Sequence, residues 1–150
     1  HTLNCLPAIH ILVGIVGATK LQSMMENRMN FKTAKKLMAN VSYSQSRNRV
    51  NNRPVKEILL DEDLLIKKFV EQDGKCYWSG LPLNEEYNYI KHHPLAISVE
   101  RLDNRLGYTY ENTVLTRRLY NLGRMAFPED EFRKVLKEMN TEIMVECEFK

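Results

Sequence analysis

The stretch from Ile97 to Arg124, ISVERLDNRLGYTYENTVLTRRLYNLGR, constrains the fold of this chain more than any other segment. Residues 95–102 alternate enough to predict a strand, and residues 103–108 carry turn chemistry. Residues 113–115 are β-branched and apolar, which predicts a second strand antiparallel to the first. Thr116 is suited to cap a helix that follows at once. The segment therefore predicts a hairpin and a short helix, the centre of a small α+β domain.

The flanking segments predict helices and loops around this unit. The spacing of Met and Leu predicts a helix over residues 20–41, and a polar run predicts a loop over 42–54. A short strand is expected at 55–60, followed by a helix that Asp61 caps and Gly74 ends. The remaining expectations are an aromatic turn or tight hairpin at 74–84, a polar loop at 84–94, and a last helix after Pro128 with an apolar stripe of Phe132, Val135, Leu136, Met139 and Ile143.

Length and charge limit the class of protein without fixing its function. A chain of 150 residues forms one domain, or one domain with an extension. We divide it into an N-terminal extension (1–33), a central domain (34–127) and a C-terminal helix (128–150). The net charge of +3 permits nucleic-acid binding but does not argue for it. Two basic clusters are either solvated faces or binding surfaces: Lys32, Lys35, Lys36, Arg47, Arg49 and Arg53; and Arg101, Arg105, Arg117, Arg118 and Arg124.

The cysteines and the apolar segment exclude several classes. Cys5, Cys76 and Cys147 form no CxxC pair, which argues against a zinc knuckle and a disulfide scaffold and favours a reducing, intracellular compartment. We expect Cys76 to be a small buried side chain. Residues 5–18 are apolar but shorter than the roughly 20 residues of a membrane span. They are expected to pack on their own domain, on a protein partner or on a second copy, and these alternatives stay open.

Three polar residues of the hairpin and helix are placed to meet. Glu100 lies on the first strand, Asn112 opens the second strand, and Asn121 lies on the helix. Carboxylate and amide oxygens are hard ligands that suit Mg²⁺ or Mn²⁺ rather than zinc. Two such ligands leave coordination positions for water and phosphate oxygens. The pattern therefore indicates a site for a divalent metal, if the three side chains converge.

These residues resemble the signature of the HNH, or ββα-metal, nuclease family. In that family an acid and a histidine lie on the first strand, an Asn opens the second strand, and an Asn or His lies on the helix. Here the corresponding residues are Glu100–Arg101, Asn112 and Asn121, and the loop LDNRLGYTYENTVL is similar as well. The resemblance extends over about residues 34–125 and implies a small ββα-metal core with flanking helices.

The resemblance implies metal-dependent hydrolysis of phosphodiester bonds, in DNA rather than RNA. Glu100 and Asn121 would hold Mg²⁺ or Mn²⁺, and Asn112 would tie down the loop and help to orient the base. The arginines of the second cluster would contact backbone phosphates: Arg105, Arg117, Arg118 and Arg124.

One departure from the family leaves the activity open. Arg101 stands where the family has its histidine base, and an arginine stays protonated, so it does not readily accept a proton from water. Tyr77, His92 and His93 are then the candidates for the missing base. Two functions follow: a metal-dependent endonuclease, or a degenerate module that binds nucleic acid without cutting it, as part of a ribonucleoprotein assembly.

Overall fold

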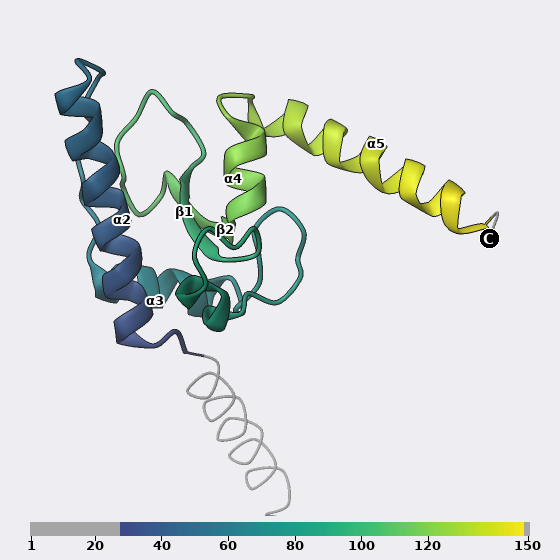
Figure 1. Ribbon diagram of the computed structural model, residues 1–150, viewed down its shortest axis with the longest axis horizontal. Helices are drawn as coiled ribbons and strands as arrows, with labels where there is room; N and C mark the ends of the chain where they lie inside the picture. The colour runs from purple at the N-terminus through teal and green to yellow at the C-terminus, as the bar shows by residue number, and fades with distance from the viewer. Residues whose placement is uncertain (1–27, 149–150) are drawn as a thin grey trace, which may run out of the picture.

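The computed structural model of the protein describes residues 28–148, with side chains up to residue 140. This part of the chain is α+β, as predicted, and combines helices with one antiparallel pair of strands (Figure 1). The apolar segment 5–18 and residues 20–27 of the helix expected at 20–41 lie outside the described residues. Residues 28–30 are not helical, because the Asn30 side chain caps a helix that begins at Phe31. The elements are α2 (Phe31–Val50), α3 (Glu62–Glu71), the 3-10 helix η1 (Glu85–Tyr89), β1 (Ile97–Arg101), β2 (Thr113–Arg117), α4 (Arg118–Arg124) and α5 (Glu129–Glu148).

The hairpin and α4 lie at the centre of the fold. β1 and β2 pair antiparallel, with Ile97 opposite Arg117 and Arg101 opposite Thr113. α4 begins directly after β2 and packs against both strands, while α2 and α3 lie on the other side of the hairpin and α5 projects away (Figure 1). The apolar core fills the space between α2, α3 and the hairpin, where Leu37, Leu65 and Leu115 are at most 1% exposed.

The structure corrects two expectations next to α2. Residues 42–50, predicted as loop, continue the helix, because Val41 and Gln45 extend its buried stripe and Asn51 caps its end. Residues 55–60 form no strand. Ile58 makes a single parallel bridge with Tyr108, and since that partner lies in the irregular loop between β1 and β2, the ladder cannot continue.

Other local predictions are confirmed only in part. The side chain of Asp61 accepts a hydrogen bond from the Leu64 amide at 2.8 Å and begins α3. α3 ends at Glu71 with Gln72 as its C-cap, and Asp73 (φ +54°) and Gly74 (φ +64°) follow in the left-handed region, so the helix ends three residues before the glycine that was expected to end it. Cys76 is buried in the turn that follows. Thr116 does not cap α4, however; it lies in β2 with a fully buried side chain, and Arg117 precedes the helix.

α5 begins after Pro128, as predicted, but its apolar stripe is only partly packed. Phe132 is buried against Trp78, with 5.0 Å between the ring centroids. Val135 and Met139 are 42% and 52% exposed, so the expected core packing stops near the first turns of the helix. Within residues 28–148, no helix has both the length and the apolar character that crossing a membrane requires.

Candidate functional site

The structure brings Asn121 of α4 against β1, next to Glu100. The Asn121 Nδ2 donates hydrogen bonds to the Ser98 Oγ at 2.8 Å and to the Val99 carbonyl at 3.2 Å. Val99 directly precedes Glu100, so the helix and the first strand meet where the sequence pattern expects them to meet. Among the described residues, the Asn121 Oδ1 accepts no hydrogen bond.

The Glu100 carboxylate is buried and fully partnered. Its side chain is 1% exposed, which removes it from solvent. One oxygen, Oε1, forms an ion pair with the Arg124 guanidinium, and the other, Oε2, accepts a hydrogen bond from the Trp78 indole at 2.8 Å. A buried charge requires this kind of complete pairing, because an unpaired carboxylate loses its hydration on burial. Glu100 therefore faces an arginine and an indole, not an open cavity.

Arg124 is part of the protein interior and differs from its expected role in phosphate contact. Its side chain is 2% exposed. Besides Glu100, its guanidinium donates to the carbonyls of Arg101, Leu102 and Phe127, the last at 2.7 Å. These contacts join β1, α4 and the segment before α5, and burial keeps the guanidinium away from phosphate in solvent.

Asn112 closes the loop between the two strands. Its Oδ1 accepts from the Asp103 amide at 2.9 Å, and its Nδ2 donates to the carbonyls of Asp103 and Gly107 at 3.0 and 2.9 Å. The Asn112 side chain is buried, so these bonds satisfy its own polar atoms and the loop backbone groups that are removed from water. The role expected for Asn112 in tying down the loop matches these hydrogen bonds.

Arg101, which stands in the place of the family's histidine, is held by the same loop. Its Nη1 donates to the carbonyls of Asn104 and Leu106 at 3.3 and 3.0 Å. The guanidinium carbon lies 4.7 Å from the centre of the Tyr108 ring, a cation–π distance. Arg101 thus stabilises the loop conformation with a permanently protonated group.

The candidate bases make their hydrogen bonds elsewhere, although the Tyr77 ring packs edge-on against Trp78, the indole that bonds Glu100, at 5.1 Å between ring centroids. The Tyr77 hydroxyl donates to the Glu129 carboxylate at 2.7 Å, and burial together with this bond raises the pKa of Tyr77. His92 is exposed with a φ of +58°, and His93 stacks on Tyr87 at 4.2 Å while its Nδ1 accepts from the Leu95 amide. None of these interactions reaches Glu100.

The other arginines proposed for phosphate contact remain accessible to different degrees. Arg105 is 89% exposed at its side chain and forms a bidentate pair with Asp103, which lowers the pKa of Asp103 to about 2. Arg117 is half-buried and donates to the Pro82 carbonyl at 3.1 Å. Arg118 is half-buried on the first turn of α4.

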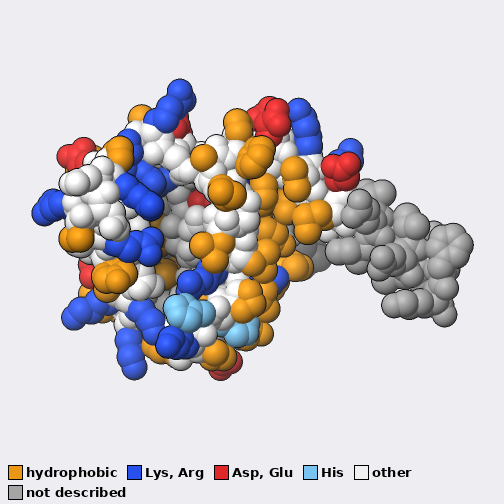
Figure 2. Space-filling view, turned by 45° about the horizontal axis from the view of Figure 1, so that its top comes forward, with side chains coloured by type: hydrophobic (Ala, Val, Ile, Leu, Met, Phe, Trp, Pro, Cys, Tyr) orange, Lys and Arg blue, Asp and Glu red, His pale blue; other side chains and the backbone are white. Residues whose placement is uncertain are grey.

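A second basic surface lies along α2, away from the hairpin. Residues 28–56 contain eight Lys and Arg and no Asp or Glu, although the whole chain has a net charge of only +3. Lys and Arg side chains gather over the half of the molecule that carries α2, around a hollow (Figure 2). We call the exposed cations on this side the α2 basic face: Lys32, Lys35, Lys36, Arg47, Arg49 and Arg53. No member forms an ion pair with a described residue.

The residues around Glu100 do not fit a Mg²⁺ or Mn²⁺ ion in this arrangement. Such an ion needs several oxygen ligands with free lone pairs facing one open position. Both Glu100 oxygens are bonded to Arg124 and Trp78, and the buried guanidinium already supplies the balancing positive charge. Over the residues that the structure describes, no three His, Cys, Asp or Glu side chains gather as a metal site.

The sequence gives a signal for the position of Arg124 in this site but none for that of Trp78. From the sequence, Trp78 is expected to be an aromatic residue of the core, and no spacing pattern links it to Glu100, which lies 22 residues away. Arg124 follows Asn121 by three positions, the spacing that places two side chains on the same face of a helix. That spacing is the available signal that Arg124 faces β1 rather than solvent.

Comparisons with protein-family models, with curated proteins and with solved structures find no match for this sequence.

Proposed function

We propose that the protein is a nucleic-acid-binding module with a ββα core of the HNH type, which binds its target without cutting it. The observation that carries this proposal is the complete pairing of Glu100 with Arg124 and Trp78. An acid that is already neutralised by a buried arginine is withheld from metal binding. Arg101, which stays protonated and bonded to the loop, does not supply a base.

The α2 basic face supports the binding part of this proposal. Lys and Arg side chains that form no ion pair attract phosphates and release counterions when they bind them. Tyr43, on the same helix, is 69% exposed and offers an aromatic face among these cations. Bases of a single strand stack on such side chains. DNA is the first target to test, with RNA beside it.

A metal-dependent endonuclease is the second candidate, and one observation favours it. Asn121 lies against the backbone next to Glu100 and keeps its Oδ1 without a hydrogen bond in the described structure. The acid and both asparagines of the resemblance are therefore present on the expected elements. This candidate requires that Glu100 exchange Arg124 for another cation.

One experiment separates the two candidates. Binding of labelled DNA and RNA is measured by fluorescence anisotropy, and plasmid nicking is measured in Mg²⁺ and in Mn²⁺. The wild-type protein is compared with Glu100→Gln, Asn121→Ala and Arg101→His. We expect salt-sensitive binding without nicking. Nicking that both Glu100→Gln and Asn121→Ala abolish would establish the endonuclease, and absence of all nucleic-acid binding would refute the binding module.

A further inference from the structure

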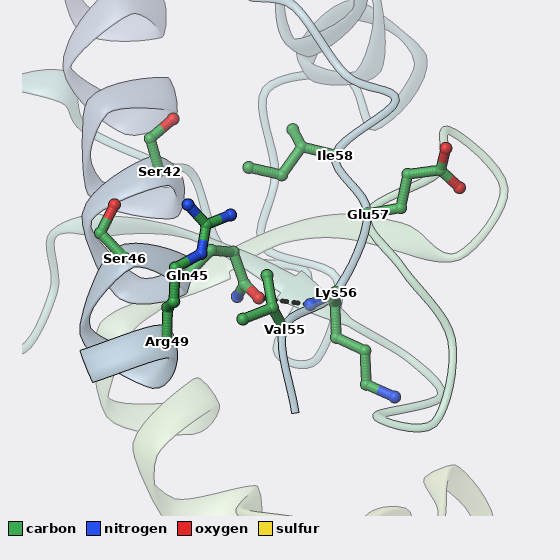
Figure 3. Close-up of a pocket in the computed structure, with 8 residues that line it drawn as sticks. All are labelled: Ser42, Gln45, Ser46, Arg49, Val55, Lys56, Glu57 and Ile58. Atoms are coloured by element: carbon green, nitrogen blue, oxygen red, sulfur yellow. Dashed lines mark hydrogen bonds between the residues drawn. The ribbon is translucent and has the colours of Figure 1, made fainter. Parts of the chain in front are cut away.

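A surface pocket of about 410 Å³ lies between α2 and the segment that follows it (Figure 3). Ser42, Gln45, Ser46 and Arg49 line it from α2, and Val55 and Ile58 close the other side. The pocket is separate from the Glu100 region. It is hollow and lined by donors on one wall and by apolar side chains on the other.

Gln45 lines this pocket, and its side chain has a buried donor without a hydrogen-bond partner among the described residues. The residue is only 6% exposed, and its Oε1 accepts a hydrogen bond from the Lys56 amide at 2.7 Å. Its Nε2 is buried and has no hydrogen-bond partner among the described residues. A buried donor without a partner is unfavourable, because it has lost its hydration and gained no hydrogen bond. An acceptor brought by a ligand would remove this cost.

The charges around the pocket select the ligand. Arg49 is exposed, and none of the α2 basic face forms an ion pair with a described residue. Glu57 is the one acid among the lining residues, and its carboxylate points away from the pocket (Figure 3). Hydroxyls, an amide donor and a guanidinium match the oxygens of a phosphoryl group.

We propose that this pocket binds a phosphoryl group, with Gln45 Nε2 as its buried donor and Arg49 as its charged contact. Arg49 is long and exposed, so it can turn aside to admit the anion and then pair with it. The serines supply the remaining donors. We assign the phosphoryl group to the backbone of a bound nucleic-acid strand. This choice of source rests on the nucleic-acid binding proposed above.

The position of the pocket supports a backbone phosphate as its occupant. The segment that closes the pocket is attached to the hairpin loop, since the Lys56 Nζ donates to the Arg105 carbonyl at 2.6 Å and the Tyr108 amide donates to the Glu57 carbonyl at 2.8 Å. A strand that lies along the α2 basic face would therefore pass the pocket and reach the loop that carries Arg105.

Two variants test the pocket, and one matched variant controls for charge. Gln45→Glu keeps the acceptor for the Lys56 amide but replaces the free donor with a carboxylate oxygen, which repels an anion. Because this position is buried, circular dichroism is used to check that the variant is folded. Arg49→Ala removes the charged contact. Arg47→Ala removes an equal charge from the same helix at a residue outside the pocket. DNA affinity is measured by fluorescence anisotropy, and inorganic phosphate is titrated while the side-chain amide signals of Gln45 are followed by NMR.

We expect Arg49→Ala and Gln45→Glu to weaken DNA binding about tenfold, and Arg47→Ala about twofold. That result assigns the pocket to a backbone phosphate. A Gln45 amide shift with inorganic phosphate, in a protein that does not bind DNA or RNA, would uphold the pocket for a free phosphate and refute only the proposed function. Pocket variants that match Arg47→Ala, together with amide signals that phosphate leaves unmoved, would overturn the inference.

Discussion

The Glu100 region and the α2 basic face both carry charged side chains, but these charges are paired in the first region and form no ion pair in the second. At Glu100 the charges are paired: Arg124 holds the carboxylate, and Arg101 is bonded to loop carbonyls. Along α2 the cations are exposed and form no ion pair with a described residue. Paired, buried charges fix a conformation, whereas unpaired, exposed charges are available to a ligand. The residues that most resemble a catalytic site are therefore those that are least available.

Arg124→Met, compared with a matched substitution on α2, should show the largest difference in stability between the two regions. It leaves Glu100 as a buried, unpaired carboxylate, and we expect the free energy of unfolding to fall by about 3–5 kcal/mol. Urea unfolding followed by circular dichroism measures the change. Arg49→Met on α2, the matched exposed control, should change stability by less than about 0.5 kcal/mol. Equal destabilisation in the two variants would show that the contrast between the regions is wrong.

Asn112→Ala tests the loop on a smaller scale. The substitution removes three hydrogen bonds to the loop backbone, and we expect the free energy of unfolding to fall by about 2–3 kcal/mol. Asn40→Ala, at an exposed position of α2, is the control and should be close to neutral. A decrease below about 0.5 kcal/mol for Asn112→Ala would mean that the loop does not depend on this side chain.

The salt dependence of nucleic-acid binding tests whether the exposed cations of α2 contact phosphates. Replacing Lys32, Lys35 and Lys36 together by Ala should lower the slope of log affinity against log salt by up to about 0.9 for each phosphate that the variant no longer neutralises. Anisotropy titrations at several salt concentrations give the slope. Arg105→Ala should change it little, because Asp103 already pairs with Arg105. A larger effect of Arg105→Ala would move the binding surface to the hairpin loop.

The smallest effect concerns the pH dependence of the Asp103–Arg105 pair. Arg105 lowers the pKa of Asp103 from 3.8 to about 2, so the folded state holds this carboxylate ionised more strongly than the unfolded chain does. The pair's contribution to stability is therefore present above pH 3.8 and is lost as the pH falls through about 2. NMR titration of the Asp103 carboxyl should show this pKa and its return toward 3.8 in Arg105→Ala. An unchanged value in the variant would contradict the assigned cause.

Local signals in the sequence predicted the elements but not the pairing of side chains between them. The cap of Asp61 and the start of α5 after Pro128 depend on neighbouring residues, and they are confirmed. α2 runs past its predicted end because Gln45 packs on the core, a tertiary contact that a polar run conceals.

In the candidate site, too, the elements could be predicted but the contacts between their side chains could not. The hairpin and the position of Asn121 next to Glu100 could be expected from strand and helix spacing. The ion pair with Arg124 and the indole contact with Trp78 join residues 24 and 22 positions from Glu100. They arise only when the elements pack, so a pattern of residue types could not distinguish a carboxylate that is free to bind metal from one that an arginine already holds.

The state of Glu100 can be measured directly by titrating the protein with Mn²⁺ and counting bound ions by electron paramagnetic resonance. Because Arg124 and Trp78 hold both carboxylate oxygens, we expect wild-type protein and Glu100→Gln to give the same weak, nonspecific uptake. One Mn²⁺ per chain in the wild-type protein, absent in both Glu100→Gln and Asn121→Ala, would contradict this account and place a metal ion where the structure has an arginine.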